Sequence, residues 1–551
     1  MKKRNALSFA ICMIVHHFLF SLVLSSQTNQ KPLTVAESSN YKATSRYDDV
    51  RAFIDSLQKK TSLFRVETLC KSTEGRDVPL LVIGNPVPSS PLDLKYDDRA
   101  VVYIQANIHA GEVEGKEASL MLARDILLQK NPSYLDKLII LIAPIFNADG
   151  NEKISTENRR NQVGPEKGVG VRYNGQKLDL NRDCMKMESP EIQGLVRNVL
   201  MRWDPALVVD CHTTNGSYHE EPVTYAWPLN PNGDASIIEY MRSKMMPFIQ
   251  KNLKEKYNTL SIPYGNFMDF KNPEKGWGTF GHQPRYVTNY IGLRNRLSIL
   301  DENYAYSDYK TRVYGCYHFL ISILDYCYSY KNEIVTLVRQ ADRKTIRRGL
   351  NPSPSDSFAV EFEVKPLEEP VTILGWEMEY VPDKKGWPPL KKLDKKKIYT
   401  IPHYADCVPK RSIPFPYGYL IPISAPKILE KLLQHGIVVE KLTEATTLEV
   451  ELFKLKEMES DKKLYQGHHL NSVKGEYVLK KEEFPAGTFF IGTAQPLGNL
   501  AASLLEPESD DGLLVWNFFD RYLVSQWRRE LQTFPVYRLL KPVRLVKETV
   551  R

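Results

Sequence analysis

The 551-residue sequence has few cysteines and lacks the short motifs of several enzyme classes. Seven cysteines are too few for a disulfide-rich scaffold in a chain this long, and no CxxC pair indicates a structural zinc or redox site. The absence of HExxH, GxSxG and GxxxxGK(S/T) patterns argues against zincins, α/β-hydrolases and P-loop nucleotide sites. An arginine-rich tract or an aromatic–basic stripe is also missing, so the sequence predicts no nucleic-acid partner.

Only one apolar run is long, and it lies at the N-terminus. Three basic residues precede an apolar stretch over residues 6–24, and small residues follow. This order is typical of a secretory signal peptide, so we expect residues 1–26 to be removed and the mature protein to be secreted or periplasmic, with no membrane span. An uncleaved anchor is the alternative, but a histidine pair inside the run would be costly in hydrocarbon. Loss of three basic residues lowers the formal net charge from +8 to +5, which indicates little about partners.

Beyond the leader, apolar runs alternate with segments of helical spacing. The alternation predicts an α/β domain with a mixed, largely parallel sheet sandwiched by helices. An expected hairpin over residues 64–84 contributes antiparallel strands. The other expected strands cover residues 100–108, 138–146, 206–211 and 297–300, and the expected helices cover residues 47–59, 114–128, 190–201, 235–253 and 309–328.

The length suits two domains, and the composition changes twice along the chain. The polar residues 27–45 are predicted to be a linker before an α/β domain over residues 46–347. Residues 348–358 are rich in proline, serine and aspartate and are predicted to be a second linker. Short alternating runs and frequent prolines then predict a smaller β-rich domain over residues 359–551.

Polar residues that could form a site follow several of the predicted strands. His109 and Glu112 form an HxxE pair after one strand, His212 follows another, and Asn181 and Arg182 stand together between them. Carboxyl ends of strands are where open α/β sheets place ligands. Two histidines and a glutamate suit a catalytic zinc with one open position, and an Asn-Arg pair can hold a carboxylate. Each group alone also has an ordinary structural explanation, such as a strand-end histidine or a surface salt bridge.

In their order along the chain these motifs resemble those of the M14 zinc carboxypeptidases. HxxE comes first, then an Asp-x-Asn-Arg segment that begins at Asp179, then the strand-end His212, and last a strand that ends at Glu302. The resemblance covers roughly residues 47–330 and looks closest to a bacterial-type branch with an additional C-terminal domain. It implies a zinc-dependent enzyme with one Zn²⁺ per chain that hydrolyses the C-terminal peptide bond of peptides or proteins.

The resemblance assigns a role to each matching residue near the metal. His109, Glu112 and His212 correspond to the zinc ligands. Asp179 corresponds to a carboxylate that orients a ligand histidine. Glu302 corresponds to the general base that takes a proton from the metal-activated water and later gives it to the leaving amine.

The substrate-facing roles transfer less directly. Arg159 corresponds to the arginine that stabilises the oxyanion, with Arg160 as the alternative, and Asn181 with Arg182 to the pair that binds the terminal carboxylate.

The family also has a mobile tyrosine that caps the substrate. Phe280 stands at its usual spacing from the general base, so Tyr286 is the expected equivalent and Tyr290 the alternative.

Two other functions are compatible with this sequence. One is an amide hydrolase of the same fold that acts on murein peptides or acylated amino acids. The other is a catalytically inert binding protein, which would predict erosion of the catalytic set. None of the six strongest positions is eroded, which argues against the second alternative.

Overall fold

The computed structural model describes residues 31–128, 133–385, 387–524 and 533–550, so the predicted signal peptide lies outside the described residues. Within these ranges, no helix is both long enough and apolar enough to cross a membrane. An eight-stranded sheet lies at the centre of the first part of the chain, with the strand order β1-β2-β4-β3-β5-β10-β6-β7. Its strands are β1 (Phe64–Lys71), β2 (Asp77–Ile83), β3 (Ala100–Ala106), β4 (Leu138–Ala143), β5 (Leu207–Thr214), β6 (Val223–Ala226), β7 (Ser261–Pro263) and β10 (Leu297–Tyr304).

The sheet is mixed, as the sequence predicts. β3 pairs in parallel with β4 and β5, β5 with β10, and β6 with β7, whereas β1–β2, β2–β4 and β10–β6 are antiparallel. β1 and β2 are joined by a short turn, which reverses the chain, whereas the helical crossover α4 between β3 and β4 returns it in parallel. β3 and β4 are buried along their whole length, which explains why their sequences are continuous apolar runs.

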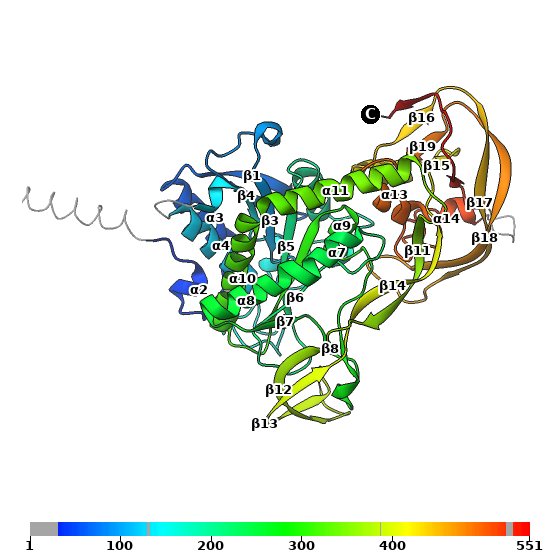
Figure 1. The fold of residues 1–551 in the computed structure, drawn as a ribbon. Coiled ribbons are helices and arrows are strands. Elements are labelled where there is room, and N and C mark those ends of the chain that lie inside the picture. Colours follow the sequence, from blue (N-terminus) through cyan, green and yellow to red (C-terminus); the bar gives the residue numbers. More distant parts are fainter. Residues whose placement is uncertain (1–30, 129–132, 386, 525–532, 551) are drawn as a thin grey trace, which may run out of the picture.

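Helices cover both faces of this sheet. Figure 1 views it nearly edge-on, with α3, α4 and α10 on one side and α9 on the other. α6 continues into a π-helical turn at Leu195–Leu200, and α8 follows a second π-helical turn at Met241–Met245. The helices of this part are α2 (Val35–Ser38), α3 (Tyr47–Gln58), α4 (Glu114–Leu127), α5 (Ala148–Asn151), α6 (Pro190–Gly194), α7 (Ala235–Tyr240), α8 (Met246–Tyr257), α9 (Val287–Leu293), α10 (Tyr309–Ser329) and α11 (Lys331–Leu350).

Residues 34–45, which belong to the first predicted linker, pack on the α/β body. Thr34 and Glu37 form a reciprocal cap on α2. The buried carboxylate of Glu117 on α4 accepts hydrogen bonds from Thr44 Oγ1 at 2.8 Å and from the backbone and hydroxyl of Ser45 at 2.7 and 3.0 Å. The polar composition of the segment therefore reflects hydrogen bonding to a buried partner.

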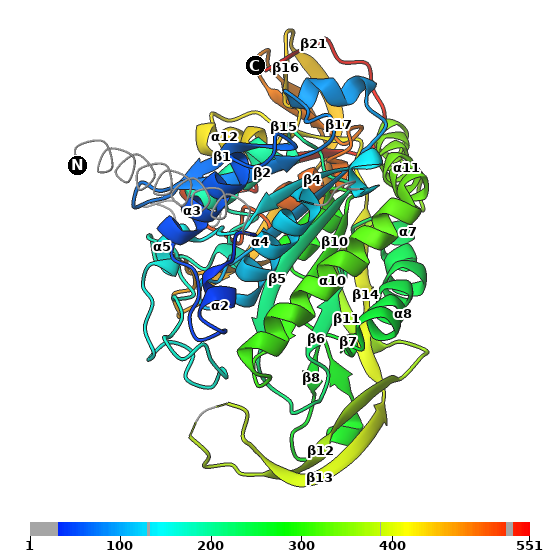
Figure 2. The ribbon, with the colours of Figure 1, turned by 90° about the vertical axis from the view of Figure 1, so that its left-hand side faces the viewer.

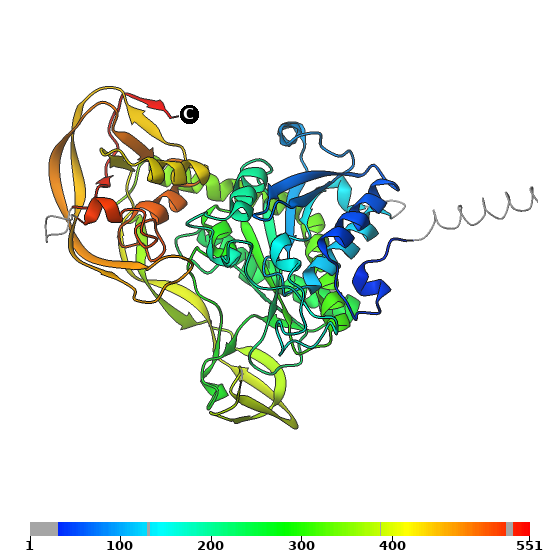
Figure 3. The same cartoon turned by 180° about the vertical axis from the view of Figure 1, so that it is seen from behind.

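The later part of the chain is β-rich, as expected. Strands β11 and β14 form a four-stranded sheet with β9 (Trp277–Gly278) and β8 (Asn266–Phe267), β12 and β13 form a two-stranded ribbon, and seven strands form a third sheet. Seen from behind, this third sheet and the ribbon lie at separate corners of the molecule (Figure 3). The elements of this later part of the chain are β11 (Ser357–Pro366), β12 (Val371–Tyr380), β13 (Leu390–Ile401), β14 (His403–Pro414), β15 (Gly418–Ile421), α12 (Pro426–Gln434), β16 (Glu440–Leu442), β17 (Thr446–Ser460), β18 (Asn471–Phe484), β19 (Phe489–Gly492), α13 (Gly498–Leu505), α14 (Asp520–Leu523), β20 (Tyr537–Leu539) and β21 (Lys547–Thr549).

The two parts of the chain are joined by backbone pairing. β14 pairs in parallel with β9, which lies before the predicted boundary at residues 348–358. One apolar core also extends from α3 to the C-terminal sheet. The division into two domains stays a prediction, and the shared sheet fixes how the two parts contact each other.

Candidate active site

Three potential metal ligands meet at the carboxyl ends of β3 and β5. His109 and Glu112 lie in the turn between β3 and α4, and His212 lies in β5 next to β3. Together they form a buried group that could hold a metal ion. His109 Nδ1 is 3.0 Å from Glu112 Oε1, and His212 Nδ1 is 2.9 Å from Glu112 Oε2. The sheet therefore brings together residues that are about a hundred positions apart in the sequence.

The spacing of these atoms fits a tetrahedral zinc ion. Zn²⁺ binds imidazole nitrogen at about 2.0–2.1 Å, so two such nitrogens in a tetrahedral shell stand about 3.3 Å apart. His109 Nδ1 and His212 Nδ1 are 3.2 Å apart. Two imidazoles and one carboxylate leave a fourth position for water or substrate, which is the donor set of a catalytic site.

Each histidine is oriented by a second carboxylate. His109 Nε2 is 2.9 Å from Asp179 Oδ1, and His212 Nε2 is 2.8 Å from Asp210 Oδ2. Such partners fix the tautomer that turns the other nitrogen toward a metal. Arg172 donates to Asp179 Oδ2 at 2.7 Å. Burial alone would raise the pKa of Asp179, but His109, Arg172 and Arg182 hold it well below its usual range.

The charges at the centre favour a cation. Burial would raise the pKa of Glu112, yet Arg159 and His109 keep it well below its usual range. Burial would lower the pKa of His212, but Asp210 and Glu112 outweigh that effect and raise it well above its usual range. The carboxylates therefore favour a positive charge on the histidines. A metal ion and a proton would compete for the same nitrogen atoms, His109 Nδ1 and His212 Nδ1.

Glu302 lies directly beside the metal-binding group. In the parallel register of β10 with β5, Glu302 stands opposite His212. Burial raises the pKa of Glu302 to about 8, with an opposing effect from His212 and a further increase from Glu112. The charge of a bound cation would lower this pKa. A carboxyl group with a pKa near neutral pH suits proton transfer in both directions.

The structure distinguishes Arg159 from Arg160, the two candidates for the arginine that stabilises the oxyanion. Arg159 donates to the carboxylate of Glu112 and lines a cavity that also contains Glu302, whereas the exposed Arg160 pairs with Glu157. Arg159 has a left-handed backbone (φ 50°), which is uncommon for a residue with a side chain. This geometry favours Arg159 as the arginine that faces a substrate.

Gly111 makes room for the Arg159 side chain. A Cβ atom at Gly111 would lie 2.7 Å from Arg159 Nε and 2.9 Å from the carbonyl oxygen of Gly170, which is closer than real Cβ contacts allow. The glycine in the HxxE motif is therefore required by close approach of the arginine and of a neighbouring backbone.

Asn181, Arg182 and Tyr286 also line the cavity. Asn181 Oδ1 accepts a hydrogen bond from the backbone of Val287 at 2.9 Å, so this side chain also holds the start of α9. The Arg182 guanidinium lies 4.3 Å from the centre of the Tyr286 ring. Tyr290, the alternative to Tyr286, is fully buried and bonds His435 Nδ1 at 2.8 Å. Of the two tyrosines, Tyr286 is the one that lines the cavity.

The cavity at this centre has a volume of about 510 Å³. All but one of the predicted site residues line it, and His212 lies behind its wall next to His109 and Glu112. The arrangement places a metal-binding group, the half-buried carboxylate of Glu302 and the guanidinium groups of Arg159, Arg172 and Arg182 around one cavity.

Known proteins are similar to this chain over regions that include the candidate site. Residues 50–214 match the model of the zinc carboxypeptidase family. Carboxypeptidase 2 of Trichophyton rubrum is 23% identical over 521 residues, which cover 91% of this chain and 90% of that protein. These two similarities support a zinc carboxypeptidase, and the matched residues 50–214 contain all three potential metal ligands. Human carboxypeptidase D is 28% identical over 199 residues, covering 34% of this chain and 13% of that protein. A metallo-carboxypeptidase from Burkholderia cenocepacia has a TM-score of 0.38 at 17% identity, over 52% of this chain and 70% of that chain.

The cavity and the metal-binding group also involve residues that the sequence did not predict. Asp210 precedes His212 by two positions, so both side chains point to the same face of β5, and this alternation could have revealed it. Arg172, Tyr264 and Trp387 carry no comparable local signal. Tyr264 and Trp387 enter the cavity from segments far along the chain.

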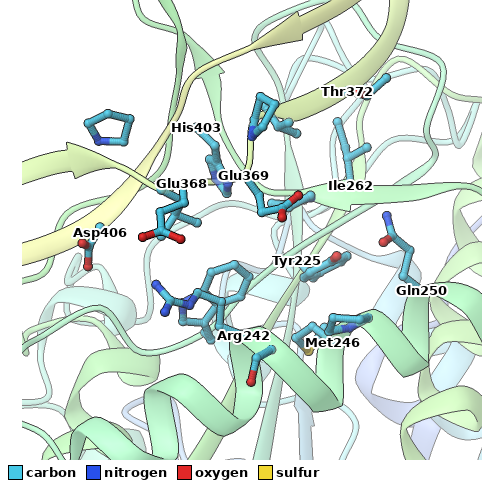
Figure 4. A pocket seen from close by; sticks show the side chains of 18 of the residues that line it. Tyr225, Arg242, Met246, Gln250, Ile262, Glu368, Glu369, Thr372, His403 and Asp406 are labelled. Carbon is cyan, nitrogen blue, oxygen red and sulfur yellow. The ribbon is translucent and has the colours of Figure 1, made fainter.

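A larger cavity of about 840 Å³ lies elsewhere on the molecule (Figure 4). Glu368, Glu369 and His403 form one wall, and Arg242 and Met246 stand opposite them. Of the described residues, the groups that could hold a metal lie outside this cavity. The smaller cavity is therefore the candidate active site.

Proposed function

We propose that this protein is a zinc carboxypeptidase that removes single residues from the C-termini of peptides, with His109, Glu112 and His212 as its zinc ligands. The observation that carries the proposal is the position of Glu302 directly opposite His212, at the same cavity as Arg182. A base beside a metal group supports hydrolysis, and the cation of Arg182 in the same cavity supports recognition of a terminal carboxylate.

Zn²⁺, when bound by these ligands, supplies a Lewis acid that polarises a carbonyl group and lowers the pKa of a coordinated water. Glu302 accepts the proton of the attacking water and then donates it to the leaving amine. Arg159 stabilises the negative charge that develops on the carbonyl oxygen. Its side chain is positioned by Glu112 and by the space that Gly111 leaves.

Arg182 and Asn181 bind the terminal carboxylate of the substrate in this proposal. A guanidinium group binds a carboxylate through two parallel hydrogen bonds. A substrate without that carboxylate would leave Arg182 desolvated and unpaired, which restricts cleavage to chain ends. Tyr286, which stacks on Arg182, closes over the bound residue.

The test compares one peptide with a free C-terminus with its C-terminal amide, with and without a chelator, by mass spectrometry. We expect chelator-sensitive loss of single C-terminal residues from the free peptide and a rate at least about 100-fold lower for the amide. Equal rates on both peptides, or cuts inside the chain, would contradict carboxylate recognition. Those results would indicate an amide hydrolase of the same fold with another substrate class.

We also infer that the protein is secreted or periplasmic, since the order of residues 1–26 is typical of a signal peptide. N-terminal sequencing of the protein exported from its host would give a start near residue 27. A start at residue 1 on membrane-bound protein would contradict this inference.

A further inference from the structure

The β12–β13 hairpin reaches from the later part of the chain to the mouth of the active-site cavity. Figure 2 shows the hairpin as an arm below the α/β body, next to β8. Trp387, in the connection between the two strands, lines the same cavity as Arg159 and Glu302. Its side chain is 49% exposed, which is unusual for so large an apolar group.

The arm is attached firmly to the α/β body. The backbone of Glu220 donates to the carbonyl oxygen of Leu374 at 2.6 Å, and the Leu374 amide donates to Glu221 Oε1 at 2.9 Å. A small apolar core also joins the two parts, and it includes Ile262, Trp277, Ile373 and Tyr399. The hairpin is thus held in position before any substrate arrives.

Trp387 is held by residues on the Arg159 side of the cavity. Its carbonyl oxygen accepts hydrogen bonds from Asn161 Nδ2 and Tyr306 Oη, both at 3.4 Å. The ring of Phe270 packs edge-on against the indole, with ring centres 4.8 Å apart. Asn161 lies two positions after Arg159 in the same loop, whereas Arg182 contacts Tyr286 and Asn181.

The direction of a bound peptide follows from this arrangement, given the proposed function. With the terminal carboxylate at Arg182 and the scissile bond at the metal group, the preceding residues leave the cavity past the Arg159 loop. We propose that Trp387 is a specificity-determining residue that packs against the substrate side chain on the amino side of the scissile bond. A half-exposed indole gains most from an aromatic or large apolar partner, which predicts a preference for such residues there.

The experiment uses two peptides with the same C-terminal residue, preceded by phenylalanine in one and by glycine in the other. The ratio of their kcat/KM values is measured for the wild-type protein and for Trp387→Ala, Trp387→Phe and Trp376→Ala. Trp376 is the matched control, because it lies on the same hairpin and packs on Lys392. We expect Trp387→Ala to lower the ratio about tenfold, Trp387→Phe to retain most of it, and Trp376→Ala to leave it unchanged.

The proposal rests on the proposed function, and the two fail in different ways. If the wild-type protein releases the C-terminal residue but Trp387→Ala leaves the ratio unchanged, Trp387 is not a specificity residue. An equal loss on both peptides would contradict the proposal too, because it indicates a general effect on the cavity. If the wild-type protein releases no C-terminal residue from either peptide, the proposed function fails and this inference fails with it.

Discussion

Glu302 is half-buried and stands opposite His212, and desolvation raises its pKa to about 8. Because it is the proposed proton acceptor and not a ligand, Glu302→Gln should lower kcat by at least about 100-fold and leave zinc content unchanged. Steady-state kinetics with metal analysis of the same sample checks this. Unchanged turnover would show that another group is the base.

Gly111 is expected to act through Arg159, since a Cβ atom there would collide with that side chain. Gly111→Ala should lower kcat/KM by at least about tenfold, toward the loss of about 100-fold expected for Arg159→Ala. The losses should be less than additive in the double variant, because Arg159→Ala removes the side-chain collision, while the Gly170 carbonyl oxygen stays close to the new Cβ atom. Additive losses would mean that Gly111 affects the site by another route.

The short helix α2 and the residues that follow it are held by Glu117 on α4. Glu117→Gln replaces one acceptor oxygen with a donor that faces other donors, which costs about 1–3 kcal/mol. We expect a protease to cleave the Glu117→Gln variant faster than wild type within residues 34–45, as measured by mass spectrometry. The control variant Asp48→Asn, at an exposed position, should be cleaved at the wild-type rate. Equal cleavage of both variants would contradict a role for Glu117 in holding this segment.

Elements with a regular apolar pattern were predictable, and those defined by distant partners were not. β4 is an unbroken apolar run because both of its faces are buried. β13 has a lysine-rich sequence that does not resemble a strand, and it forms because β12 pairs with it while Leu390 and Tyr399 are buried. Trp387 reaches the active site only through this pairing, so no pattern near Trp387 could have shown it.

The same contrast holds within the active site. His109, Glu112 and His212 follow strands whose carboxyl ends meet, and so their convergence could be predicted. Whether Tyr286 or Tyr290 faces the cavity depends on how α9 packs, and a single helical turn separates the two residues.

At the scale of the whole molecule, stability should depend on pH through Glu191. Burial raises the pKa of Glu191 to about 7, above its ordinary value of 4.5. Between these values the folded protein keeps a proton that the unfolded chain releases. Stability therefore falls as pH rises from about 4.5 to 7, and the loss persists above pH 7.

Glu191→Gln removes this effect and retains an acceptor for Asn174 Nδ2, which lies 3.0 Å from the carboxylate. We expect the variant to be more stable than wild type by about 2–3 kcal/mol at pH 8 and equal to it at pH 4. Denaturant unfolding at both pH values measures the difference. An equal stability difference between variant and wild type at pH 4 and pH 8 would show that ionisation of Glu191 does not cause the pH dependence.

The central claim is that His109, Glu112 and His212 hold one zinc ion that the reaction needs. The most direct measurement is the metal content of purified wild-type protein and of His212→Ala, together with activity before chelation, after it and after zinc is restored. We predict one zinc per wild-type chain, loss of zinc and activity in His212→Ala, and recovery of wild-type activity with zinc. Full zinc content in His212→Ala, or full activity in metal-free wild type, would contradict the account.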